Sequence, residues 1–263
     1  MPLLVRYAYG IALFILAAAT IGAAPATAEE FSDAQKSAIE KIVGEYIAAH
    51  PELIADYLRK NPEILIEVST ILKEKQAQQE REAAAYAIEA NRQKIERHPM
   101  SPTSGNAQGD VTLVEFFDYN CVYCKKVFTY MMQLADEDPK LRIVWKDLPI
   151  LGPVSHYAAK AAMAAHRQGK YMAFHMAAMG GGRLTSEAQV LQIAAEVGLD
   201  VDRLKKDMED PAIEAYLQET IDLAGLLGIN GTPGFVAGKQ VIAGALEKDN
   251  MKRLIEHVRV NGS

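Results

Sequence analysis

The chain has 263 residues, 49% of them hydrophobic and 24% charged, and its formal net charge is −6. This composition is ordinary for a soluble globular protein with one domain and an additional segment. A negative net charge without a basic face argues against nucleic acid as a partner.

The first 28 residues have the pattern of a cleaved secretory signal. Arg6 is the only charged side chain before Glu29, residues 11–19 are all apolar, and a small-x-small pattern ends at Ala28. An uncleaved membrane anchor is the alternative, although the apolar run is shorter than the ~20 residues that span a bilayer. We therefore expect residues 1–28 to direct the protein to the periplasm, where disulfides can form.

Residues 29–97 have helical patterns and no strand-like alternation. Ser32 and Gln35 fit a capping box, and the apolar residues that follow recur at helical spacing. A proline followed by glutamate occurs at Pro51 and again at Pro62, and proline is favoured at the first position of a helix. The sequence predicts three helices that are broken at these two prolines.

The apolar stripes of these helices have too few partners to be buried within so small a segment. Exposed apolar faces of this size usually mark an interface. We expect residues 29–97 to form a stalk through which copies of the chain assemble. The alternatives are that the helices fold back onto the rest of the chain, or that the segment is partly disordered.

Residues 98–109 are rich in Pro, Gly, Ser and Asn, which predicts a linker in front of a second domain at 110–263. This domain opens with a β-branched apolar strand at 111–117, a helix that starts at two cysteines, and a strand at 141–146. A strand, a helix and a strand in this order form a unit with parallel strands.

Helical patterns fill an insertion at about 152–228. Short strands at 235–237 and 240–243 form a hairpin, and a helix follows from about 246 to 258. The expected fold is therefore a small α/β domain with a helical insertion.

The two cysteines of the chain, Cys121 and Cys124, form a C-x-x-C pair at the predicted helix start. Backbone N–H groups and the helix dipole favour a thiolate at the first position, so we assign Cys121 as the nucleophile. Cys124 is then the resolving thiol of a redox-active disulfide. A static disulfide would stabilise little across so short a loop. A zinc site lacks further ligands, so no metal or cofactor is expected.

Two features elsewhere suit the same chemistry. Glu115 is the only charge in its apolar strand, and a buried carboxylate has a raised pKa that suits proton transfer. The alternative is that Glu115 faces outward at a sheet edge.

Gly231 to Gly234 fit a tight turn in which the Thr232-Pro233 bond is a candidate for the cis form.

The segments EFFDYNCVYCKK, DLPILGP and GTPGFV, with the helical insertion, together resemble the DsbA family of the thioredoxin superfamily over about 110–258. The repeated HPE and NPE motifs resemble the ScsC-like branch, in which an N-terminal helical segment makes oligomers. The resemblance implies a thioredoxin-like fold and a Thr232-Pro233 loop that binds the substrate backbone beside the cysteines. It also implies that Glu115 serves proton transfer for Cys124, and it favours a trimer over a dimer.

Between the cysteines, Val122 and Tyr123 replace the Pro-His pair of DsbA proper. We place both residues in the substrate-binding surface. Without a histidine to stabilise the thiolate further, we expect a weaker oxidant that is better suited to reducing or shuffling disulfides.

The expected function is that of an oligomeric periplasmic disulfide isomerase or reductase. Its partners would be unfolded or misoxidised exported proteins and a membrane thiol-disulfide redox partner. A DsbA-like oxidase that introduces disulfides is the first alternative.

An alternative of another class is a copper-binding or chaperone-like protein of a copper-tolerance system. Met172, His175, Met176 and Met179 recur at helical spacing, and thioether and imidazole groups suit Cu(I). Methionine is also a common filler of cores, so the same pattern predicts the inner face of a helix.

Overall fold

The structure, a computed structural model, describes residues 30–262. The expected signal at residues 1–28 therefore lies outside the described residues. The chain divides into two compact units, with the division between Glu67 and Val68. Within the described range, no helix is long and apolar enough to cross a membrane.

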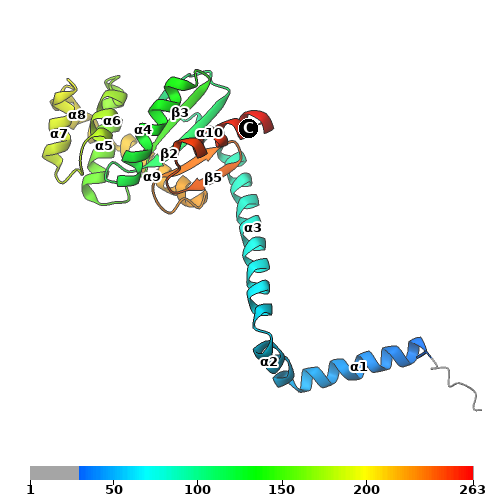
Figure 1. Ribbon diagram of the computed structural model, residues 1–263. Helices are drawn as coiled ribbons and strands as arrows, with labels where there is room; N and C mark the ends of the chain where they lie inside the picture. Colours follow the sequence, from blue (N-terminus) through cyan, green and yellow to red (C-terminus); the bar gives the residue numbers. More distant parts are fainter. Residues whose placement is uncertain (1–29, 263) are drawn as a thin grey trace, which may run out of the picture. The chain divides into compact units, whose positions relative to one another are not determined.

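The helices and strands keep the labels of Figure 1. The helices are α1 (Asp33–Ala49), α2 (Pro51–Lys60), α3 (Glu63–Glu96), α4 (Val122–Glu137), α5 (Pro153–Arg167), α6 (Tyr171–Gly180), α7 (Glu187–Glu196), α8 (Val201–Met208), α9 (Pro211–Leu226) and α10 (Lys248–Asn261). The strands are β1 (Thr103–Gly105), β2 (Val111–Phe117), β3 (Leu141–Asp147), β4 (Gly234–Ala237) and β5 (Gln240–Ala243).

The first unit contains α1, α2 and the start of α3. The predicted capping box is confirmed, because Ser32 N donates to Gln35 Oε1 at 2.9 Å and Gln35 N donates to Ser32 Oγ at 3.4 Å. Pro51 occupies the first turn of α2, and α3 begins directly after Pro62. These positions confirm the predicted helix breaks.

No residue of α1 or α2 is buried. The large apolar side chains of the first unit that stay exposed are Phe31, Ile39, Ile42, Val43, Tyr46, Ile47, Leu53, Ile54, Tyr57, Leu65 and Ile66. A single chain therefore leaves uncovered the apolar surface that the helical pattern predicted.

The second unit is built on a five-stranded sheet with the strand order β1-β3-β2-β4-β5. Strands β2 and β3 are parallel, as the predicted strand-helix-strand unit requires, and the other neighbours are antiparallel. Glu115 pairs with Trp145, and Phe117 pairs with Asp147. The hairpin of β4 and β5 is also confirmed.

Strand β1 lies inside the segment expected to be a linker. It pairs with the edge of β3, and Trp145 Nε1 donates to Ser104 Oγ at 3.0 Å. The sequence of this segment shows no strand periodicity. The segment becomes a strand because the edge of β3 offers unpaired backbone groups. Gly105 has φ +71°, and a Cβ there would lie 2.4 Å from the Leu141 carbonyl oxygen, so only glycine fits this approach.

The alternation of β2 divides its side chains between the two faces of the sheet. Leu113 and Phe117 point toward α4, α10 and the insertion, whereas Val114 and Phe116 point to the other face. By the same alternation, Glu115 lies on the face of Leu113 and Phe117. This is the face that also carries both cysteines.

The part of α3 after Val68 belongs to the second unit, and only its last turns pack against the other face of the sheet (Figure 1). Ile88 and Ile95 are fully buried there, together with residues of α9. Two cations of β3 bind the final carbonyls of α3. Lys146 Nζ donates to the Lys94 oxygen at 2.7 Å, and Arg142 Nη1 donates to the Glu96 oxygen at 2.8 Å.

These contacts satisfy carbonyls that have no partner within the helix and place positive charge at its negative end. The structural division at 67/68 thus differs from the expected boundaries at residues 97 and 109. Helical spacing alone does not reveal which turns of a long helix contact a sheet.

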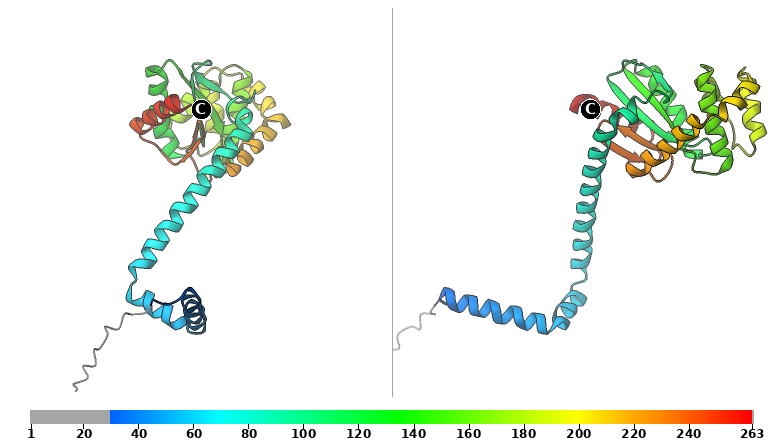
Figure 2. Two further views of the ribbon diagram at one scale, coloured as in Figure 1. Left: turned by 90° about the vertical axis from the view of Figure 1, so that its right-hand side faces the viewer. Right: turned by 180° about the vertical axis from the view of Figure 1, so that it is seen from behind.

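The insertion consists of α5 to α9, and α5 packs against each of the other four helices. Helices α7 and α8 lie on the side of the domain away from α10, as the right-hand view of Figure 2 shows. The buried residues of the insertion form one continuous core with α4 and the face of the sheet that carries the cysteines.

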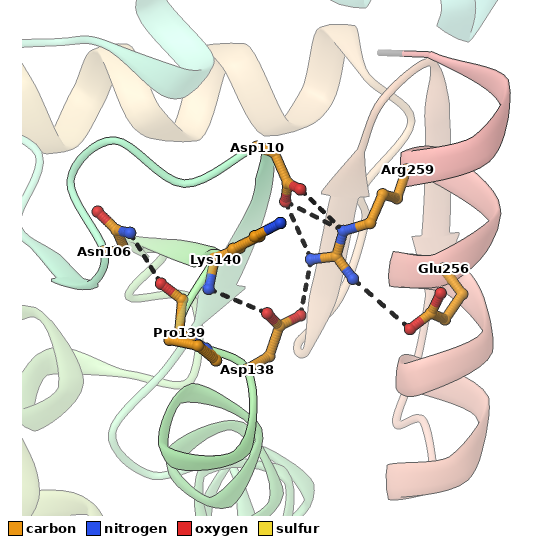
Figure 3. Close-up of polar contacts among 7 residues, drawn as sticks. All are labelled: Asn106, Asp110, Asp138, Pro139, Lys140, Glu256 and Arg259. Atoms are coloured by element: carbon orange, nitrogen blue, oxygen red, sulfur yellow. Dashed lines mark hydrogen bonds and ion pairs between the residues drawn. The ribbon is translucent and has the colours of Figure 1, made fainter.

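Arg259 on α10 forms ion pairs at the end of the domain away from the insertion (Figure 3). Its Nη2 donates to Asp110 Oδ1 at 2.9 Å and to Asp138 Oδ2 at 2.7 Å. The hydrogen bond from Arg259 holds the pKa of Asp110 below its usual value. This cluster joins α10 to the start of β2 and to the end of α4, so both ends of the strand-helix segment are fixed.

We predict that Ile95→Ala destabilises the second unit by about 2–5 kcal/mol, because it leaves a cavity where α3 meets the sheet. Urea unfolding followed by the fluorescence of Trp145, the only tryptophan, measures the change. Tyr86→Ala is the matched control on the same helix, since Tyr86 is 79% exposed. Equal stability of the two variants would show that α3 is not part of this core.

Candidate active site

Cys121 is the N-cap of α4. The strand β2 ends at Phe117, and the turn that follows closes with a hydrogen bond from Cys121 N to the Asp118 oxygen at 3.0 Å. Cys124 N then donates to Cys121 Sγ at 3.2 Å. The sulfur thus takes the place that a serine or aspartate oxygen has in an ordinary N-cap.

The two thiols are reduced and differ in their electrostatics. The hydrogen bond from the Cys124 side chain, with smaller contributions from Thr232 and the amides of Cys124 and Tyr123, lowers the pKa of Cys121 to about 6 against the effect of burial. Burial, then the contacts with Cys121 and Glu115, raise the pKa of Cys124 far above its usual value. At neutral pH the thiolate therefore resides on Cys121.

Thr232 and Pro233 lie opposite the first cysteine. Their peptide bond is cis, and Cys121 Sγ lies 3.2 Å from the Thr232 carbonyl oxygen. A protonated Cys121 donates to this oxygen, whereas the thiolate has no proton to donate. The sequence thus brings together two segments that lie 111 positions apart.

The glycine after this proline keeps the loop close to the segment that follows α9. A Cβ on Gly234 would lie 2.5 Å from Ile229 Cγ2, so a larger residue would displace the loop. The Pro233 oxygen also accepts from Gly244 N at 2.9 Å, which ties the loop to the end of β5. Both contacts fix the carbonyl that faces Cys121.

Glu115 is fully buried in the centre of the sheet. Neither carboxylate oxygen has a hydrogen-bond partner among the described residues. Burial, and to a smaller extent the charge of Cys121, raise the pKa of Glu115 well above its usual value. The alternative of an outward-facing edge position is therefore wrong, because β2 lies between β3 and β4.

Asp118, which the sequence reading did not single out, anchors the start of the active-site turn. Its Oδ1 accepts from Ser155 Oγ at 2.7 Å, and its Oδ2 accepts from Leu151 N at 2.9 Å. Asp118 is nearly fully buried. It thereby joins the turn before Cys121 to the first residues of the insertion.

The next two residues are anchored to other parts of the insertion. Tyr119 Oη shares a hydrogen bond of 3.0 Å with His175 Nδ1 on α6. Asn120 donates to the Leu184 oxygen at 3.1 Å and accepts from Leu184 N at 2.8 Å. The sequence offered one signal for these contacts: three residues with hydrogen-bonding side chains lie between the strand and the cysteines.

The four residues of the methionine and histidine pattern do not share one environment. His175 and Met179 are buried, Met172 is partly buried, and Met176 is 51% exposed. Burial, and then the charge of Lys125, lower the pKa of His175 to about 3, so the imidazole is neutral. The inner-face prediction therefore holds for His175 and Met179 and is wrong for Met176.

Residues 30–262 contain no cluster of three or more His, Cys, Asp or Glu side chains that could hold a metal. Val122 and Tyr123, between the cysteines, are 74% and 65% exposed. They therefore lie on the surface beside Cys121.

Comparisons with known proteins relate both units to described families. A family model for the DSBA-like thioredoxin domain matches residues 112–256. A model for the N-terminal domain of the copper resistance protein ScsC matches residues 52–79.

Among solved structures, a thioredoxin-like oxidoreductase from Silicibacter pomeroyi is 44% identical, with a TM-score of 0.64 over 65% of this chain and 99% of the other. BcfH from Salmonella enterica Typhimurium is 26% identical, with a TM-score of 0.71 over 83% of this chain and 99% of BcfH. Proteus mirabilis ScsC in a compact conformation is 25% identical, with a TM-score of 0.62 over 80% and 96%.

Curated relatives include the Na(+)/H(+) antiporter NhaA 3 of Salinispora tropica, which is 29% identical over 143 residues, or 52% of this chain. The chain spans 22% to 27% of the length of such relatives. The family match covers more than half of the chain and agrees with the sheet, the insertion and the paired cysteines. The chain therefore belongs to the DsbA-like thioredoxin family and carries an ScsC-type N-terminal domain.

Proposed function

We propose that this chain exchanges disulfides with exported proteins, with Cys121 as the attacking and Cys124 as the resolving thiol. The observation that carries the proposal is the position of Cys121 Sγ, 3.2 Å from Cys124 N and 3.2 Å from the Thr232 oxygen. The amide stabilises the thiolate, and the neighbouring loop offers backbone groups to a bound polypeptide.

The reaction begins when the Cys121 thiolate attacks one sulfur of a substrate disulfide. A new bond forms between Cys121 and that sulfur, and the other substrate sulfur leaves as a thiolate. In isomerisation, a different substrate thiolate attacks the sulfur bound to Cys121, which forms a new substrate disulfide and releases Cys121 as a thiolate. In reduction, Cys124 loses its proton and attacks Cys121. This step forms the Cys121-Cys124 disulfide and releases, as a thiolate, the substrate sulfur that was bound to Cys121.

Glu115 is proposed to exchange the proton of Cys124. Burial raises the pKa of Glu115 well above its usual value, which favours the protonated carboxyl over the carboxylate. A carboxylic acid there can protonate Cys124 when it leaves the Cys121-Cys124 disulfide. The ionised carboxylate accepts the proton in the reverse direction.

The surface around Cys121 supports binding of unfolded polypeptide. Val122 and Tyr123 are exposed, as are Ile150 and Leu151 at 43% and 46%. Leu151 N binds Asp118, three positions before Cys121, so this second apolar pair belongs to the active-site surroundings. Exposed apolar side chains attract the apolar segments that folded proteins bury.

The pKa of Cys121 favours isomerase or reductase activity over strong oxidation. At about 6, it lies well above the ~3.5 of DsbA and near the ~7 of thioredoxin. A less stabilised thiolate makes the reduced state less favourable and the disulfide a weaker oxidant. A DsbA-like oxidase is the alternative, and the experiment on α1 below separates the two.

Assembly through the first unit would support isomerisation. Its exposed apolar residues suit contact with further copies of the chain, and we favour a trimer over a dimer on the ScsC-type match. Several active sites around one substrate raise the effective thiol concentration. We place the protein in the periplasm with a membrane thiol-disulfide partner, consistent with the N-terminal signal pattern.

We predict that Ile42→Glu with Tyr46→Glu disrupts the oligomer, because both side chains lie on the exposed apolar face of α1. Light scattering should show a smaller particle, and reactivation of scrambled ribonuclease should fall by at least about tenfold as avidity is lost. Oxidation of a reduced dithiol peptide should be unchanged.

Ser37→Glu with Ala48→Glu is the matched control, since it adds the same charge to the opposite side of α1. A dissociated variant that keeps full ribonuclease reactivation would contradict the isomerase proposal and favour the oxidase.

We predict that Glu115→Gln stabilises the reduced protein at pH 7.5 and slows disulfide exchange. The pKa of Glu115 is raised in the folded protein, whereas in the unfolded chain it is about 4.3. Above pH 4.3 this difference makes the wild-type carboxyl lower the free energy of unfolding. The stability gained by Glu115→Gln should therefore vanish near pH 4. Calorimetry should show a melting temperature at least about 3 °C higher at pH 7.5. Glu247→Gln, which alters an exposed acid paired with Lys126, is the control. A lower melting temperature for Glu115→Gln would contradict the assignment.

A further inference from the structure

Lys125 follows the resolving cysteine and points toward the insertion. Its Nζ donates to the Ala178 carbonyl oxygen at 2.5 Å. Ala178 lies in the last turn of α6, where unpaired carbonyls form the negative end of the helix dipole. Lys126, one position further, instead points outward and pairs with Glu247 at 2.6 Å.

The surroundings of Lys125 are partly buried and contain anions. Burial lowers the pKa of Lys125, and the negative charges of Asp118 and the Cys121 thiolate oppose this effect. His175 on α6 is neutral and adds no charge. Lys125 directly follows Cys124 in the first turn of α4 and is four positions after Cys121, so it lies on the helix face of Cys121. The Ala178 carbonyl of the insertion holds its ammonium there.

We propose that Lys125 is a positioning residue that holds a positive charge beside the reduced Cys121-Cys124 pair through its bond to the end of α6. This inference rests on the proposed thiol-disulfide exchange. The Cys121 thiolate carries a negative charge, whereas the disulfide carries none. A fixed cation therefore stabilises the reduced pair selectively and makes the disulfide a better oxidant.

The hydrogen bond to Ala178 explains why Lys125, and not Lys126, holds a positive charge near the cysteines. A lysine side chain is long and flexible, and a free ammonium would turn toward water. The α6 carbonyl keeps the ammonium in the partly buried region, where charges interact more strongly than in water. The insertion thus contributes to the redox centre through a backbone carbonyl, that of Ala178.

The test compares full-length Lys125→Met with wild type in two measurements. Titration of the thiolate absorbance should place the Cys121 midpoint at least about half a pH unit higher in the variant, which corresponds to about threefold in the equilibrium constant. Equilibration with reduced and oxidised glutathione should show the variant disulfide to be less oxidising by a similar factor.

Lys126→Met is the matched control and should titrate like wild type, since its ammonium pairs with Glu247. Lys125→Arg, which keeps the charge, should restore both values. Lys125→Gln, which keeps a donor for the Ala178 carbonyl without the charge, should behave like Lys125→Met. It replaces that variant if the near-ultraviolet spectrum of Lys125→Met shows loss of packing.

Identical values for Lys125→Met, Lys125→Gln and wild type would overturn the inference, as would a failure of Lys125→Arg to restore them. A wild-type protein that does not exchange with glutathione would instead overturn the proposed function. The two failures are thus distinguishable in one set of measurements.

Discussion

The hydrogen bond from Cys124 N to Cys121 Sγ, 3.2 Å long, is the contact on which the chemistry depends. It exists because Cys121 caps α4, so that an amide without a helical partner faces a sulfur. The same geometry brings the second thiol close enough to donate to the first. Two chemically identical side chains thereby acquire opposite protonation states at neutral pH.

The rest of the domain keeps that N-cap in place. The active-site turn is bound to the insertion through Asp118, Tyr119 and Asn120, and the opposite loop is held by the close approach of Gly234 to Ile229. Because the turn has partners in several segments of the insertion, a local distortion in one of them is restrained by the others. The helical insertion therefore supports the redox centre as well as enlarging the core.

Local patterns predicted the features that local physics controls. Strand β2, the helix start at Cys121 and the capping box at Ser32 follow from side-chain alternation and cap chemistry within a few residues. The burial of Ile95 and the pairing of β1 depend on contacts with β3, which no periodicity records. For the same reason, the partners of the active-site turn were missed, because each lies more than 30 positions away.

The most direct test of the central claim is the pH dependence of alkylation by iodoacetamide, with the modified cysteine identified by mass spectrometry. Since only thiolate reacts, the rate should rise with pH through a midpoint near 6, and the label should be on Cys121. Cys124→Ser, which keeps a donor, should titrate at lower pH than Cys124→Ala. A midpoint near the ~8.5 of a free cysteine, or equal labelling of both sulfurs, would contradict the account.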